Sequence, residues 1–174
     1  MQESVIYKKA IALKYPEQIV LALMADPGGK TNIITLGWSM VCSHEPPMLA
    51  IAVGNTRYSY ELLSQSDEFV LAFPGRNMAK EALFCGTHSG RQVDKIAETG
   101  LELMPGIKGD VPLLKQAVAN FEMRITSRLL TGDHTIFAGT VLASYRHVDP
   151  PERLYTLGPG YALGYPEMKQ QQSG

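Results

Sequence analysis

The chain has 174 residues, of which 45% are hydrophobic and 19% are charged, and its net charge is −1. These values are ordinary for a globular protein large enough to bury a core, so they argue against disorder. The near-neutral balance provides no basic face for nucleic acid, and no apolar run reaches the roughly eighteen residues that a membrane helix needs.

The same features predict where the protein works and how it is divided. The N-terminus has no apolar stretch of the kind found in signal peptides. Two cysteines, Cys42 and Cys85, are too few for a disulfide framework and fit a reducing cytoplasm. We therefore expect a cytoplasmic protein with one domain over residues 1–174, a core over about 16–164 and a flexible tail over about 168–174.

Strand patterns dominate the first half of the chain. An apolar run over residues 19–25 ends at a turn cluster, 26–29, and a second run over 31–42 returns as one long strand. Together they predict a β-hairpin. Shorter apolar strands are expected over 48–53, after the two prolines 46–47, and over 69–73.

The clearest alternation lies in the second half. Ala119, Phe121, Met123 and Ile125 are separated by polar residues, which predicts a strand with one buried face. The turn 131–133 follows, and residues 134–145 are expected to return as an antiparallel partner.

The expected helices are few and short. Ser59 is a candidate N-cap for a helix over 60–66, and Asn77 for one over 78–85 that stops at Gly86. Asp94 is a candidate cap for one or two turns ending at Gly100. The fold class is therefore mainly β, a barrel with a few short peripheral helices.

Three familiar site patterns fail. Gly29 begins an imitation of a phosphate-binding loop, but Met24 stands where the loop needs glycine. The glycines at 158–164 lack the spacing and the strand–helix setting of a dinucleotide loop. Cys85 and His88 have no second pair of ligands, so we expect no metal site.

Four polar clusters remain that a plain barrel does not need. They read N-x-x-T-x-G-W from residue 32, G-N-T-R-Y-S from 54, S-G-R-Q-V-D-K from 89, and G-D-H-T-I-F-A-G from 132. In this order, over about residues 16–164, they resemble the flavin reductase-like family with an FMN-binding split barrel of Greek-key type, and most closely its flavoredoxins.

The resemblance implies an FMN site. In the family's pattern, Asn32, Thr35, Trp38, Ser59, Lys95 and His134 match positions that contact the flavin. The chemistry of FMN agrees, because its dianionic phosphate needs cations and amide donors, and its ring needs flat apolar walls. The predicted contacts are Asn32, Thr35, Gly37, Trp38, Asn55, Thr56, Arg57, Ser59, Ser89, Gly90, Arg91, Lys95, His134 and a C-terminal tyrosine, Tyr161 or Tyr165.

Each of these residues taken alone also has an ordinary interpretation. Arg57 and Arg91 would usually be solvated surface charges, Lys95 could lie on a helix face, and Trp38 could belong to a core or an interface. It is their joint order that favours a flavin site.

The resemblance also implies a function. It indicates a homodimeric flavin reductase or flavoredoxin-like protein that passes electrons from NAD(P)H or a protein donor, through bound FMN, to a free flavin or a protein acceptor. No obligatory catalytic acid is expected, although His134 is a possible participant. The alternatives are a non-enzymatic FMN carrier or sensor, a relative that binds deazaflavin, one that binds haem through His44, His88, His134 or His147, and a structural barrel that retains no ligand.

Overall fold

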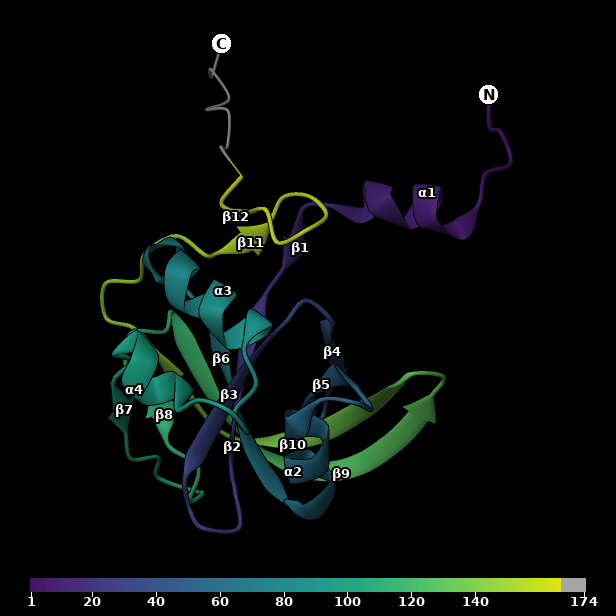
Figure 1. The fold of residues 1–174 in the computed structure, drawn as a ribbon. Coiled ribbons are helices and arrows are strands. Elements are labelled where there is room, and N and C mark those ends of the chain that lie inside the picture. Colours follow the sequence, from purple (N-terminus) through teal and green to yellow (C-terminus); the bar gives the residue numbers. More distant parts are fainter. Residues whose placement is uncertain (167–174) are drawn as a thin grey trace.

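The computed structural model describes residues 1–166, and a seven-stranded antiparallel sheet forms its centre (Figure 1). The strand order is β3-β2-β6-β9-β10-β5-β4, and every neighbouring pair runs antiparallel. The bounds are β2 (Val20–Ala25), β3 (Thr31–Leu36), β4 (Ser39–His44), β5 (Pro47–Gly54), β6 (Glu68–Phe73), β9 (Ala119–Thr131) and β10 (His134–Arg146). The flexible tail predicted over 168–174 lies outside the described residues.

The sheet curls because its two edge strands are consecutive in the chain. β3 and β4 lie at opposite edges, yet only Gly37 and Trp38 separate them. Two residues can bridge only a few ångströms, so the edges must come close together. The backbone N–H of Ala52 in β5 donates to the carbonyl of Trp38 (N···O 2.9 Å), which fixes the crossing. The result is a barrel that is split between β3 and β4.

Both faces of the sheet are covered, and strand β2 shows why its sequence is continuously apolar. Leu21 and Leu23 point into one core cluster, while Val20 and Met24 point into the other. The first cluster lies under helix α3 (Ala79–Thr87), and the second includes residues of α2 (Tyr58–Gln65). A strand buried on both faces loses the period-two pattern of a half-exposed strand.

Several short helices and two small sheets lie around the barrel. A three-stranded sheet joins β1 (Glu17–Gln18), β11 (Tyr155–Thr156) and β12 (Leu163–Gly164), and β7 (Leu103–Met104) pairs with β8 (Leu113–Leu114). The N-terminal arm, α1 (Tyr7–Ile11) and the 3-10 helix η1 (Ala12–Lys14), projects from the body (Figure 1). The remaining helices are η2 (Arg76–Met78) and α4 (Lys95–Thr99). None of the helices within residues 1–166 has the length and apolar character needed to cross a bilayer.

The predicted fold is confirmed, and so are the first hairpin, the β9–β10 pair and the cap of α4. Asp94 accepts hydrogen bonds from the N–H groups of Ile96 and Ala97, and Gly100 ends the helix at a φ of 67°. The single strand over 31–42 was wrong, because the chain changes sheet edge at Gly37.

Two predicted helix boundaries were also wrong. Helix α2 begins after Arg57, and Ser59 lies buried inside it, where its hydroxyl accepts a hydrogen bond from the Asn32 amide instead of capping the helix. Helix α3 begins after η2 and continues through Gly86 to Thr87, so Asn77 does not cap it.

Strand β9 departs from simple alternation because two of its polar residues are buried. Asn120 exchanges hydrogen bonds with the backbone of Leu114. Glu122, only 2% exposed, accepts the backbone N–H groups of Ile107, Lys108 and Gly109 at 2.6–2.8 Å. These two side chains supply hydrogen-bond partners for the backbone of the segments that cover β9. A buried face of the strand can therefore carry polar residues.

Candidate functional site

Two connected cavities open at the split of the barrel. The larger has a volume of about 630 Å³ and the smaller about 210 Å³. Ile34, Arg57 and Gly86 line both, so they form one elongated cleft. The larger cavity reaches from β3 to the N-terminal arm, and the smaller one lies between the start of α2 and the segment after α3.

The smaller cavity is built to attract an anion. Two cations, Arg57 and Lys95, line it, and no Asp or Glu stands among its described lining residues. The Arg57 side chain forms no hydrogen bond or ion pair within residues 1–166. Ser59, Ser89 and Gly90 complete this wall. Unpaired cations beside hydroxyls and a glycine turn are the donors that a phosphate group requires.

Lys95 is the most constrained of these donors, since only 5% of it is exposed. Its ammonium donates to the carbonyls of Ile33 (2.7 Å) and Cys85 (2.8 Å), so β3 and α3 fix its position. The third proton has no acceptor within residues 1–166. Burial, together with the nearby Arg57 charge, lowers the pKa of Lys95. A bound anion would relieve this cost, because it favours the charged form.

A buried polar atom without a partner lies at the same wall. Asn32, 7% exposed on β3, donates through its amide to Ser59 Oγ (Nδ2···Oγ 2.9 Å), while its Oδ1 has no partner among residues 1–166. Gly90 packs directly on that oxygen, and a side chain at residue 90 would collide with it. Since buried polar atoms are nearly always satisfied, Asn32 indicates a missing hydrogen-bond donor.

The larger cavity has the flat apolar walls that a planar ring needs. The rings of Trp38 and His134 lie against each other, with centroids 4.5 Å apart. His134 Nδ1 lies 2.7 Å from the Asp133 carboxylate, and this hydrogen bond lowers the pKa of Asp133. That pairing leaves His134 Nε2 free beside Gly54, on the cavity wall.

The C-terminal segment supplies the opposite wall. Tyr161 lines the larger cavity, and its ring reaches the neighbourhood of Gly86. Tyr165 instead packs against Arg76, whose guanidinium carbon lies 4.6 Å from the centroid of the Tyr165 ring. Thr35, on β3, lines the cavity and donates to the carbonyl of Ala82 (2.6 Å), which holds α3 against the strand. Of the two tyrosines left open by the sequence, the structure places Tyr161 at the cleft.

Three predicted contacts are not among the described lining residues of the cleft, since Asn32 lies behind Gly90 and the other two have partners elsewhere. Asn55 bonds to the β9–β10 turn, since its amide donates to the carbonyl of Gly132 and accepts from the hydroxyl of Thr135. Arg91 pairs with Glu61 and lies over the ring of Tyr58. The structure brings the other predicted residues together along the cleft: Thr35, Gly37, Trp38, Thr56, Arg57, Ser59, Ser89, Gly90, Lys95, His134 and Tyr161.

Some lining residues were not predicted. Lys14 and Glu17, at the base of the arm, line the larger cavity, and His88 lines the smaller one while stacking on Phe84 (centroids 3.9 Å apart). Lys14 and Glu17 lie before the first of the four motifs, where no sequence signal marks them. His88 lies within the third motif and could have been included.

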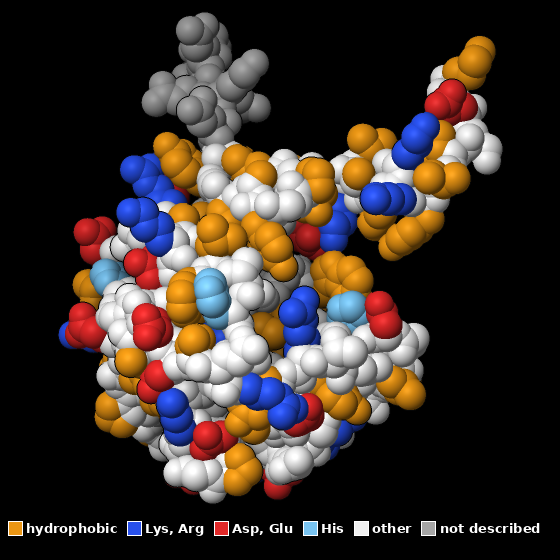
Figure 2. Space-filling model, viewed as in Figure 1, with side chains coloured by type: hydrophobic (Ala, Val, Ile, Leu, Met, Phe, Trp, Pro, Cys, Tyr) orange, Lys and Arg blue, Asp and Glu red, His pale blue; other side chains and the backbone are white. Residues whose placement is uncertain are grey.

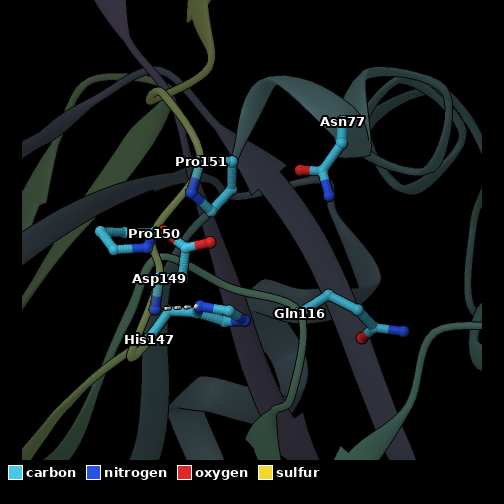
Figure 3. A pocket seen from close by; sticks show the side chains of 6 residues that line it. All are labelled: Asn77, Gln116, His147, Asp149, Pro150 and Pro151. Carbon is cyan, nitrogen blue, oxygen red and sulfur yellow. Dashed lines mark hydrogen bonds between the residues drawn. The ribbon is translucent and has the colours of Figure 1, made fainter.

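A separate surface cavity of about 400 Å³ lies elsewhere on the molecule (Figure 3). Asn77, Gln116, His147 and Asp149 line it with two prolines, and it shares no lining residue with the cleft. The hydrogen bond drawn there runs from the backbone N–H of Asp149 to His147 Nδ1. Within residues 1–166, no three His, Cys, Asp or Glu side chains are placed to hold a metal ion.

Cys85, at the floor of the smaller cavity, should be chemically inert in the folded protein. Burial raises the pKa of its thiol to about 11, although the Lys95 charge opposes the shift, so the reactive thiolate is scarce at neutral pH. In a Cys42→Ser variant, we expect maleimide at pH 7.5 to label no site in native protein and one site after unfolding. Rapid labelling of the native variant would contradict this.

The comparisons agree with this geometry. Residues 13–162 match the family described as flavin reductase like domain. An uncharacterized protein of Archaeoglobus fulgidus is 36% identical over 130 residues, which span 75% of this chain and 73% of that protein. A flavin reductase (NADH) of Kitasatospora aureofaciens is 27% identical over 149 residues, 84% of this chain and 75% of that one.

Solved structures show the same fold. A flavoredoxin from Methanosarcina acetivorans superposes with a TM-score of 0.82 at 24% identity, over 100% of this chain and 97% of its own. The predictions of a split barrel and of a flavin oxidoreductase are thereby confirmed at the level of fold and family. The chain belongs to the flavin reductase-like family.

Proposed function

We propose that this protein is a flavin reductase that holds FMN in the cleft at the split of the barrel. One observation carries the proposal: Lys95 in the smaller cavity and Arg57 at its junction with the larger one face a space whose described lining holds no carboxylate, and the larger cavity beyond has aromatic walls. FMN has the matching shape, with a dianion at one end and a planar ring at the other.

The residues present fit the group. Arg57 and Lys95 would hold the phosphate, with the hydroxyl of Ser89 and the backbone at Gly90 as further donors. Asn32, whose Oδ1 lies behind Gly90 and has no partner within residues 1–166, stays a proposed contact of the same wall. Trp38 and Tyr161 would flank the ring. Each of these contacts is a proposal that the variants below test.

When bound, the flavin would supply the chemistry of hydride transfer, which no side chain of the protein can supply. The protein's own part is to bind, orient and shield. The Trp38 and His134 rings form a wall against water, and Asp133 holds the imidazole so that Nε2 faces the cavity as a hydrogen-bonding group for the donor. NADH or NADPH is the proposed donor, and free flavin or a redox protein the acceptor.

An oxidation assay tests this function. Purified protein with added free FMN should oxidise NADH or NADPH at a rate proportional to enzyme concentration, and the reaction should fall at least tenfold in an Arg57→Ala variant. An Arg146→Ala variant, which changes an exposed arginine outside the cleft, is the matched control. No oxidation of either nucleotide by protein that does bind FMN would favour the alternative, a flavin carrier or sensor.

The haem alternative is less supported by the structure. A haem iron needs an axial ligand inside the barrel, and none of the four histidines, His44, His88, His134 and His147, is buried. The buried Cys85 keeps its proton at neutral pH. A deazaflavin would occupy the same cleft, and the absorption spectrum of the bound group separates it from FMN.

The cytoplasmic location stays a prediction.

We also propose that the protein is a homodimer. Ten exposed large apolar residues come from three short segments, the N-terminal arm, β4 with the preceding Trp38, and the tip of β9. The larger cavity joins the arm to Trp38 and His134, and Figure 2 shows apolar side chains along the projecting arm. Large apolar side chains exposed in this number are a liability unless they are covered, and a second copy of the chain would cover them permanently. These residues are Val5, Ile6, Tyr7, Ile11, Leu13, Trp38, Met40, Val41, Leu129 and Leu130.

Light scattering during gel filtration tests the dimer. We expect a mass near twice the 19.1 kDa of the chain, and a shift to monomer in a Leu13→Glu, Val41→Glu double variant. Leu83→Glu, at an exposed position on α3, should leave the mass unchanged. A wild-type monomer at micromolar concentration would refute the proposal.

A further inference from the structure

An ion pair lies at the end of the cleft opposite the phosphate-binding cations. Lys14 Nζ donates to Glu17 Oε1 (2.8 Å) and lies 2.7 Å from Oε2. The two side chains are 26% and 21% exposed, so water screens them only in part. Lys14 ends η1 and Glu17 begins β1, which places the pair where the arm joins the barrel.

This pair faces the apolar end of the cleft. The Lys14 ammonium lies 5.4 Å from the centroid of the Trp38 ring. The Glu17 carboxylate is in contact range of Gly37, 3.1 Å from where a Cβ would stand. Lys14 and Glu17 both line the larger cavity, and neither lines the smaller one. The phosphate end and the ring end of the cleft therefore each carry charge, but only the ring end carries both signs.

We propose that Lys14 and Glu17 act with opposite signs on the reduction potential of the bound flavin, so that the intact pair keeps the potential close to its value without either charge. The inference rests on the proposed FMN site. Reduction of a flavin by two electrons with uptake of one proton adds one negative charge to the ring system. Lys14 stabilises that charge and Glu17 opposes it, so the two effects largely cancel while both residues are present.

Removing the charge of one residue leaves the charge of the other without its opposing effect on the flavin. Lys14→Gln leaves the Glu17 carboxylate facing the ring and should lower the potential. Glu17→Gln leaves the ammonium and should raise it. The double variant should return close to wild type, and Lys14→Arg, which keeps the charge, should change little. A pair that only ties the arm to the barrel would destabilise the protein in both single variants without moving the potential in opposite directions.

The experiment measures dissociation constants of FMN in its oxidised and dithionite-reduced forms for each variant. Because binding and reduction are linked, the dissociation constant of reduced FMN divided by that of oxidised FMN reports the shift in potential. This holds even where a variant binds both forms more weakly. We expect this ratio to rise several-fold in Lys14→Gln and to fall several-fold in Glu17→Gln. Lys115→Gln and Glu102→Gln, from an exposed ion pair outside the cleft, are controls that should leave it unchanged.

The outcomes separate the two proposals. If wild-type protein binds neither form of FMN, the proposed function fails. If FMN binds but the ratio is equal in all variants, or shifts the same way in both single variants, the charge-pair inference alone is overturned. Opposite shifts that vanish in the double variant establish it.

Discussion

A Lys95→Ala variant should lose FMN. The substitution removes the buried cation at the phosphate end, and a hydrogen bond to a charged group is worth about 1.5–3 kcal/mol. Affinity should therefore fall roughly 10- to 100-fold. The loss should be visible as flavin absorbance missing from the purified variant, and as a raised dissociation constant in a fluorescence titration.

The controls for Lys95 separate binding from folding. Lys80→Ala, at an exposed position on α3, should keep wild-type flavin occupancy. Because Lys95 also holds the carbonyls of Ile33 and Cys85, its alanine variant should be less stable even without flavin. Lys95→Met keeps most of the volume without the charge, so it should bind FMN weakly while folding better than Lys95→Ala. Equal occupancy in the Lys80 and Lys95 variants would remove Lys95 from the site.

A Glu122→Gln variant should be destabilised by about 2–3 kcal/mol, because the carboxylate receives several charge-assisted hydrogen bonds that an amide cannot match. Besides three backbone N–H groups, Glu122 accepts the hydroxyl of Tyr145. For a chain of this size, each kcal/mol lowers the melting temperature by roughly 2–4 °C. Thermal and urea unfolding of the variant and of wild type measure the difference.

This effect should depend on pH in a defined direction. Burial by itself raises the pKa of Glu122, but the hydrogen bonds from Tyr145 and from the backbone outweigh it and hold the pKa below its ordinary value. A lowered folded pKa means that the stabilisation is complete above about pH 4.3, the usual value for glutamate, and is lost as the pH falls through the folded value. The stability gap between wild type and variant should narrow in acid. Glu102→Gln, from an exposed ion pair, should show almost no gap at any pH.

The sequence was sufficient to predict those helix ends and strand pairs that depend on residues close together in the chain. The Asp94 cap, the Gly100 stop and the β9–β10 pair all rest on residues that act within a few positions of themselves. The break at Gly37 was missed because it depends on two strands meeting at the far edges of a sheet. The buried Glu122 was missed for the same reason, since its partners lie 13 to 15 residues away in a loop.

The candidate site shows the same division. The four motifs identified most of the cleft, because each is a compact segment with unusual polar residues. They did not distinguish Arg57, which lines the cleft, from Arg91, which pairs with Glu61 of helix α2. The choice between Tyr161 and Tyr165 likewise depended on where the C-terminal segment crosses the barrel.

Titration of the purified protein with FMN, followed by visible absorbance and flavin fluorescence, tests the central claim most directly. The claim is that the cationic and aromatic halves of one cleft together hold this molecule. We predict saturable binding of one FMN per chain with flavin absorption bands, weakened by Arg57→Ala and not by Arg146→Ala. A protein that leaves added FMN free in solution, or that carries a Soret band instead, would contradict it.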